Sequence, residues 1–109
     1  PMFQMCLGTG SGAPGDPAVL QPMISRLPHN AVWGAFGCGR TEMPIVAAAA
    51  IMGGNVRVGL EDNIYLRKGV LADNQGLVRN AAEILDRIVY KVATIDASRK
   101  KLNLPARKN

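Results

Sequence analysis

Histidine, cysteine and aromatic residues are scarce in this chain of 109 residues, and each shortage narrows what it can do. The single histidine, His29, and the two cysteines, Cys6 and Cys38, match no zinc-finger spacing. One disulfide between the two cysteines is conceivable, but no secretory feature of the sequence supports oxidation. We therefore expect two buried free thiols, as is usual in a reducing cytosol.

Long hydrophobic runs are also missing. The longest, Ile45 to Met52, is far shorter than the ~20 residues that a membrane-spanning helix needs. The sequence shows no basic leader followed by an apolar core, so we expect a cytoplasmic protein without a membrane partner. The chain opens directly on apolar residues, Pro1 to Leu7, without an initiator methionine. We expect it to be a piece of a longer polypeptide.

The net charge of +5 is unevenly distributed along the chain. From Arg87 onward, seven lysines and arginines face one aspartate, whereas residues 1–86 carry six basic and seven acidic side chains. Nucleic-acid binding would call for aromatic residues among the basic ones, and Tyr90 is the only aromatic after Arg87. We favour a solvated basic helix over a nucleic-acid-binding module, which stays a weaker alternative.

Short apolar segments alternate with segments of helical character. Met2 to Leu7, residues 31–36 and the stretch from Asn55 read as buried strands. Between them, Asp16-Pro17 announces a first helix, shortened or kinked by Pro22, and a second helix runs from Thr41 to Met52.

The last third of the chain predicts two more helices, after a loop over residues 64–72. The longer one begins at Asp73 or Asn74, and a shorter one runs from about Asp96 to Leu102. The apolar stripe expected on the longer helix consists of Leu77, Val78, Ala81, Ile84, Leu85, Ile88 and Val92.

This β-α-β-α-β-α-α order predicts an α/β fold with a parallel sheet covered by helices. Three strands make a poor sheet alone, so we expect the C-terminal three β/α units of a (β/α)8 TIM barrel, which needs ~250 residues in all. Residues 1–54 would form two units, residues 55–92 the last strand and helix, and residues 93–109 a C-terminal helix and basic tail. All belong to a single domain.

Functional residues of such folds gather at the C-terminal ends of the strands. The glycine-rich loop from Gly8 to Gly15 follows the first strand, but it lacks both the G-x-G-x-x-G and the P-loop spacing, which favours a flexible loop over a phosphate site. Arg40 follows the second strand. It could bind an anionic substrate or a phosphate of a cofactor, or form an ion pair with a carboxylate such as Glu42.

The third strand carries the strongest candidates. If the strand stays extended, Val56, Val58 and Leu60 face the helices while Arg57, Gly59 and Glu61 face the other side. Glu61 would then lie ~13 Å from Arg57, so each charge would need a separate partner. The partner of Glu61 would be a metal ion or a cation from another strand, and that of Arg57 a carboxylate or an anionic ligand.

In this arrangement Gly59 leaves space for a ligand between the two charges. Asp62, at the tip of the strand, is placed to act as a general base or to position one. The alternative to a binding site is an internal layer of ion pairs.

Residues 53–63 read GGNVRVGLEDN, and further matching residues follow at Tyr65-Leu66, Lys68-Gly69, Leu71-Ala72, Asn74 and Leu77-Val78. Together they resemble the C-terminal signature of the β-keto acid cleavage enzymes, of the 3-keto-5-aminohexanoate cleavage type. The resemblance spans nearly the whole chain and is most specific over positions 53–78.

The resemblance implies a (β/α)8 barrel with one divalent metal, usually zinc, that acts as a Lewis acid on the keto oxygen. It implies a reaction between a β-keto acid and acetyl-CoA that gives acetoacetate and a new CoA thioester. Glu61 matches the family's metal-ligand glutamate, Arg57 the arginine that engages the substrate, and Asp62 the aspartate implicated as general base. We also expect a homo-oligomer.

Two departures from the family pattern stand out. Asn55 occupies the position where the family usually has a histidine, and the two histidines of the family's H-x-H metal motif have no counterpart in this chain. Because one glutamate is not a zinc site, we expect the 109 residues alone to be inactive and the full-length parent to be the enzyme. The competing hypothesis is an inactive barrel fragment that persists by oligomerising through its sheet edges.

Overall fold

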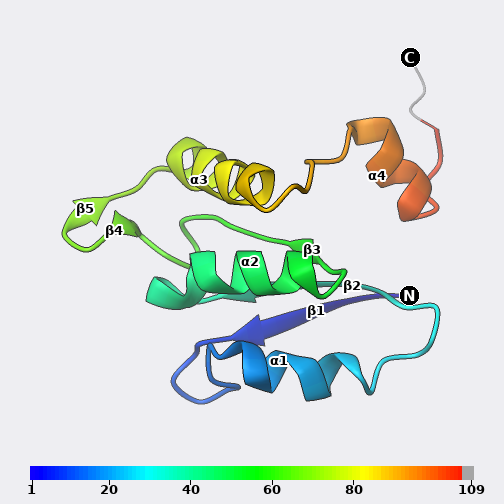
Figure 1. The fold of residues 1–109 in the computed structure, drawn as a ribbon, viewed down its shortest axis with the longest axis horizontal. Coiled ribbons are helices and arrows are strands. Elements are labelled where there is room, and N and C mark those ends of the chain that lie inside the picture. Colours follow the sequence, from blue (N-terminus) through cyan, green and yellow to red (C-terminus); the bar gives the residue numbers. More distant parts are fainter. Residues whose placement is uncertain (107–109) are drawn as a thin grey trace.

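Three parallel strands organise the computed structural model of this chain, which describes residues 1–106. β1 (Met2–Leu7), β2 (Val32–Gly37) and β3 (Asn55–Val56) lie side by side in this order (Figure 1). β1 and β2 pair over six residues, whereas β3 pairs with β2 at only two positions. The predicted parallel sheet is therefore confirmed, and β1 and β3 are its two edges in the described part of the chain.

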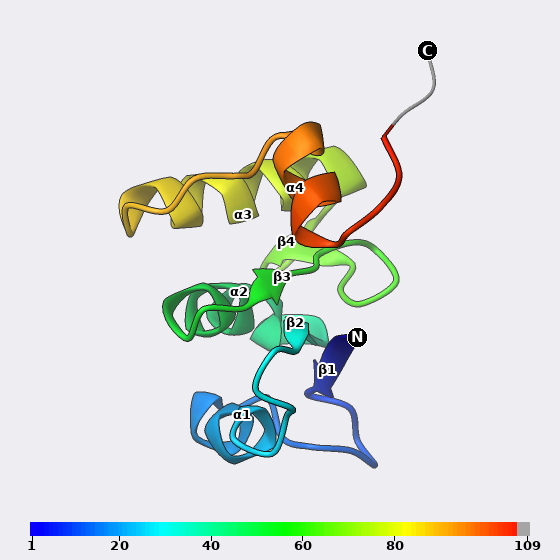
Figure 2. The same cartoon turned by 90° about the vertical axis from the view of Figure 1, so that its right-hand side faces the viewer.

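Two helices cover one face of this sheet. α1 (Pro17–Ile24) and α2 (Glu42–Ile51) lie on the same side of the three strands (Figure 2). The core between them and the sheet consists of Met5, Leu7, Leu20, Trp33, Ala35, Ile45, Ala48 and Ala49. In the described part of the chain no helix covers β1 on the opposite face, called the bare face below, where Gln4 and Cys6, which alternate with core residues along β1, are exposed.

The helix starts follow from local sequence. The carboxylate of Asp16 accepts a hydrogen bond from the Ala18 N–H at 2.9 Å, and Asp73 caps the N-terminus of α3 (Asn74–Arg87) in the same way through Gly76 at 2.7 Å. Each cap is worth about 1 kcal/mol. Pro22 lies inside α1, which is only eight residues long and ends at Ile24. The predicted shortening of this helix is thus confirmed.

The third strand is much shorter than predicted. β3 ends at Val56, and residues 60–62 form a turn instead of continuing the extended strand. Residues 64–72, predicted as a loop, contain a small antiparallel hairpin of β4 (Tyr65–Arg67) and β5 (Val70–Leu71).

Two further helices follow the hairpin. α3 (Asn74–Arg87) packs on α2, and α4 (Ile95–Lys101) follows after a connecting segment (Figure 1). The apolar stripe predicted for α3 extends too far, because Val78 is 56% exposed and Val92 lies beyond the helix and is 66% exposed.

Val89 explains where α3 ends. Its φ is +66°, a left-handed conformation that β-branched residues rarely adopt. Its N–H donates to the Asp86 carbonyl, and the next N–H, of Tyr90, donates to the Leu85 carbonyl at 2.8 Å. These two hydrogen bonds form a Schellman motif, which usually has glycine at this position.

Within the described part of the chain, every helix is too short or too polar to span a lipid bilayer. Arg107 and Lys108, which belong to the expected basic tail, lie outside the described residues.

Replacing Val89 by glycine should raise the free energy of unfolding by about 1 kcal/mol, because glycine adopts positive φ without a steric cost. The Val89 side chain is 91% exposed, so its removal forfeits little packing. Urea denaturation measures the change. The matched control is Val92→Gly, at an exposed position without positive φ, which should be neutral or mildly destabilising. Equal losses of stability in both variants would contradict the assignment of strain to Val89.

Candidate functional site

The charged residues predicted from the third strand meet at the C-terminal end of the sheet. Arg57 lies just beyond β3, and Glu61 and Asp62 lie on the turn that follows. We call residues 59–63 the acidic turn. The two acidic side chains of this turn differ in exposure: Asp62 is 4% exposed and Glu61 is 71% exposed.

Arg57 holds both carboxylates at once. Its Nε and Nη2 donate to the two oxygens of Asp62 at 2.9 and 2.7 Å, and Nη2 also lies 2.9 Å from Glu61 Oε1. Hydrogen bonds to Asp62 raise the pKa of Arg57 further above its usual range. The guanidinium also lies over the Phe36 ring, 4.0 Å from the centroid.

The expected ~13 Å separation of Arg57 and Glu61 is therefore wrong. The chain does not stay extended, because the N–H groups of Asp62 and Asn63 both donate to the Gly59 carbonyl, at 3.1 and 3.2 Å. This closes the acidic turn and folds the carboxylates back onto the arginine. The ion-pair network, one of the two sequence alternatives, is present, and ligand binding by the same residues stays a prediction.

Gly59 itself is buried, and a Cβ atom on it would face the Asn74 side chain at 3.4 Å. The ligand space expected beside this glycine is therefore bordered by α3.

Glu42 is the site residue that sequence reasoning missed. It lies in the first turn of α2 and is completely buried. Its Oε2 accepts from the Gly59 N–H at 3.1 Å and its Oε1 from Asn63 Nδ2 at 3.3 Å. Burial raises the pKa of Glu42, although both hydrogen bonds act in the opposite direction. A lone glutamate one residue before an apolar helical run gave no sequence signal for this role.

Arg40 lies apart from this cluster. It is exposed, on the short 3-10 helix η1 (Gly39–Thr41) that joins β2 to α2. The ion pair with Glu42 that we considered is not formed, since both Glu42 oxygens are engaged by the acidic turn. Anion binding by Arg40 stays a prediction.

The two cysteines are free, as expected, but they are not both buried. Cys6 is exposed on the bare face of the sheet, and Cys38 is partly exposed where β2 ends. Burial raises the pKa of the Cys38 thiol, and the neighbouring Cys6 raises it further. The expectation of burial failed for Cys6 because β1 is covered by helices on one side only.

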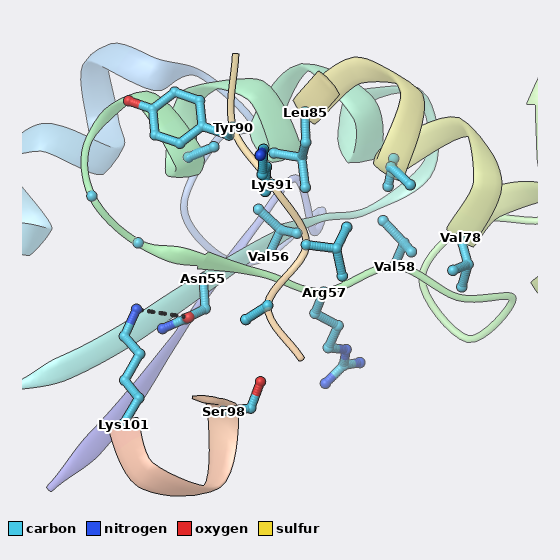
Figure 3. Close-up of a pocket in the computed structure, with 17 residues that line it drawn as sticks. Asn55, Val56, Arg57, Val58, Val78, Leu85, Tyr90, Lys91, Ser98 and Lys101 are labelled. Atoms are coloured by element: carbon cyan, nitrogen blue, oxygen red, sulfur yellow. Dashed lines mark hydrogen bonds between the residues drawn. The ribbon is translucent and has the colours of Figure 1, made fainter. Parts of the chain in front are cut away.

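Asn55, which stands where the family usually has histidine, has structural partners. Its Nδ2 donates to the Trp33 carbonyl at 2.8 Å, and its Oδ1 accepts from Lys101 Nζ at 3.2 Å. Figure 3 shows the second contact, which ties α4 to β3. The amide therefore connects β2, β3 and α4.

A groove of about 720 Å³ runs beside β3, between α3 and α4. Arg57 belongs to its lining, together with Tyr90, Lys91 and Lys101 (Figure 3). In Figure 3, Val56 and Val58 project toward α3, whereas the guanidinium of Arg57 projects away from it. The alternation predicted for the start of this strand holds as far as Val58.

Comparison with known proteins identifies relatives over almost the whole chain. The model of the beta-keto acid cleavage enzyme family matches residues 1–104. A 3-dehydrocarnitine:acetyl-CoA trimethylamine transferase of Rhizobium meliloti is 42% identical, with 97% of this chain and 35% of that protein covered.

Two further relatives show the same partial coverage. A 3-keto-5-aminohexanoate cleavage enzyme of Fusobacterium nucleatum is 36% identical, over 94% of this chain and 37% of that protein. A 3-oxoadipate:acetyl-CoA acetyltransferase of Cupriavidus necator is 34% identical, over 95% and 38%. The chain thus spans little more than a third of the length of these relatives.

The raised pKa of Glu42 predicts a pH dependence of stability. The folded chain binds the Glu42 proton more tightly than the unfolded chain, whose glutamates titrate near pH ~4.3. This contribution is complete below that pH and is lost as pH rises through the folded pKa. The free energy of unfolding of the wild type, minus that of Glu42→Gln, should therefore fall from pH 4 toward pH 8. Urea denaturation of both proteins measures it, and a constant or rising difference would contradict the prediction.

Proposed function

Because the chain belongs to the beta-keto acid cleavage enzyme family, we propose that the full-length protein exchanges a β-keto acid with acetyl-CoA, giving acetoacetate and a new CoA thioester. Acetyl-CoA stands in the names of the relatives from Rhizobium meliloti and Cupriavidus necator, which supports it as co-substrate. The observation that carries the proposal is the cluster of Arg57, Glu61 and Asp62 at the C-terminal end of the sheet.

We propose that Arg57 binds the substrate carboxylate without releasing Asp62. Its Nε and Nη2 are engaged by the two acids, while Nη1 makes no hydrogen bond within residues 1–106. A guanidinium carries five N–H donors, so Nη1 can still bind an incoming carboxylate. Arg40 and Gly59 complete the proposed substrate contacts, with Arg40 as a peripheral anion contact.

Asp62 is the proposed general base. It would take a proton from the carbon between the two carbonyl groups of the substrate, and the resulting carbanion would attack the thioester carbonyl of acetyl-CoA. This attack expels the CoA thiolate, which then adds to the original keto carbonyl of the substrate. Cleavage of the bond between that carbonyl carbon and the attacking carbon leaves the new CoA thioester, and the departing carbanion takes back the proton from Asp62 as acetoacetate. The bidentate contact with Arg57 orients the carboxylate, as a general base requires.

We also propose that the protein binds zinc through Glu61. One carboxylate does not hold zinc, and no cluster of three histidine, cysteine, aspartate or glutamate side chains suited to a metal occurs in residues 1–106. The described residues therefore do not form a metal site by themselves, and we derive no step through the metal. For the same reason the 109 residues alone are proposed to be inactive.

The proposed architecture is a (β/α)8 barrel to which this chain contributes three units. The supporting observation is that α1 and α2 cover one face of the sheet only, whereas open doubly wound sheets are covered on both faces. In a barrel the bare face, with Gln4, Cys6 and Arg57, would line the interior. The groove beside β3, the last strand, would then receive the first strand of the barrel, supplied by the rest of the full-length protein.

Replacing Arg57 by lysine in the full-length protein should lower kcat/KM about 100-fold, because lysine keeps the charge but loses the fork that holds Asp62. The assay is acetyl-CoA-dependent formation of acetoacetate from a panel of β-keto acids. Arg67→Lys, at an exposed position on β4, is the matched control and should behave like the wild type. Full activity of R57K would remove Arg57 from the mechanism, and an inactive wild type would refute the proposed reaction.

Replacing Glu61 by glutamine should reduce bound zinc from about one per chain by about tenfold. Elemental analysis of the purified full-length protein measures this without relying on activity. Glu83→Gln, at an exposed position on α3, should leave the zinc content unchanged. If E61Q retains zinc like the wild type, Glu61 is not a ligand.

A further inference from the structure

We propose that Glu42 is the positioning residue of the site, whose buried carboxylate determines where the acidic turn holds Asp62. The contacts of Glu42 are independent of any assumed reaction. Only the catalytic consequence of this inference rests on the proposed function.

Glu42 contacts the acidic turn at both of its ends. Its Oε2 accepts from the Gly59 N–H, where the turn begins, and its Oε1 accepts from the side-chain amide of Asn63, where the turn finishes. Arg57 also contacts the turn at two residues, Glu61 and Asp62, whereas Gly39 and Asn74 each contact it at one. Gly39 N–H donates to the Asp62 carbonyl at 2.7 Å, and Asn74 Oδ1 accepts from the Leu60 N–H at 2.9 Å.

The chemistry of these contacts requires a carboxylate. Both groups that meet Glu42 are hydrogen-bond donors, and an ionised carboxylate accepts with two oxygens and donates nothing. A glutamine would turn an NH₂ group toward one of the two donors and leave a buried N–H without a partner.

Burying this charge is itself unfavourable, as the raised pKa of Glu42 reflects. An apolar residue would pack at this position at lower cost. The presence of a glutamate that spans the turn is explained if the position of the turn matters to function.

The position of Asp62 depends on these contacts through a short path. Asn63 follows Asp62 directly, and its own amide also binds the backbone of Tyr65. Releasing Gly59 and Asn63 would let the turn shift, and with it the carboxylate that Arg57 orients. A misplacement of about 1 Å at a reacting group can cost about 100-fold in rate.

The test compares Glu42→Ala, Glu42→Gln and the matched surface control Glu83→Ala in the full-length protein. Hydrogen exchange followed by mass spectrometry should show exchange over residues 57–66 about tenfold faster in E42A, with E42Q intermediate and α1 unchanged. The rate constant kcat should fall about 10- to 100-fold in E42A, with E42Q again intermediate and KM for acetyl-CoA within about threefold of wild type.

A double-mutant cycle separates positioning from general destabilisation. If Glu42 acts through Asp62, adding E42Q to Asp62→Asn should lower kcat little further, because the base is already lost. Equal losses in both backgrounds would overturn the proposal, as would unchanged exchange over residues 57–66.

If E42A does not fold, E42Q is compared with the wild type in the same two measurements. Faster exchange in a protein whose wild type shows no acetyl-CoA-dependent cleavage would refute the proposed function and the catalytic role of Glu42, while leaving its contacts with the turn intact.

Discussion

The closed turn between Gly59 and Asn63 is the constraint on which the candidate site depends. An extended chain would separate Arg57 from Glu61 by ~13 Å, whereas the turn brings their side chains to 2.9 Å and buries Asp62 against the same guanidinium. The turn is stable because its N–H donors find acceptors inside and outside it, among them the buried carboxylate of Glu42. Without that carboxylate the backbone of the turn would lack a buried partner, and the ion pairs would lose their geometry.

The parallel sheet supplies the frame for this turn. Because β1, β2 and β3 run in the same direction, Cys6, Cys38 and Arg57, which lie near their C-terminal ends, are found at the same end of the sheet. α1 and α2 lie on the face of the sheet that is opposite to Cys6, where Leu7, Trp33 and Ala35 are buried. The apolar core and the charged cluster thus lie on the two faces of the same strands, and the charged residues do not interrupt the core.

Local signals made most of the fold predictable from the sequence. The aspartate caps, the alternation of strands and helices and the parallel order all follow from neighbouring residues. The acidic turn could not be predicted in this way, because one of its partners, Glu42, lies 17 residues before the Gly59 N–H that it binds. The end of α3 was missed for a different reason, since Val89 adopts a conformation that sequence patterns associate with glycine.

The contacts of Arg57 also bear on how an anionic substrate could bind. A carboxylate that displaced Asp62 would leave a side chain that is 4% exposed without its cation, and an unpaired buried charge is costly. Glu61 is 71% exposed, so water can solvate it if its contact with Nη2 is lost. The less costly route is therefore binding at Nη1 with loss, at most, of the Glu61 contact. That route would leave Asp62 oriented throughout.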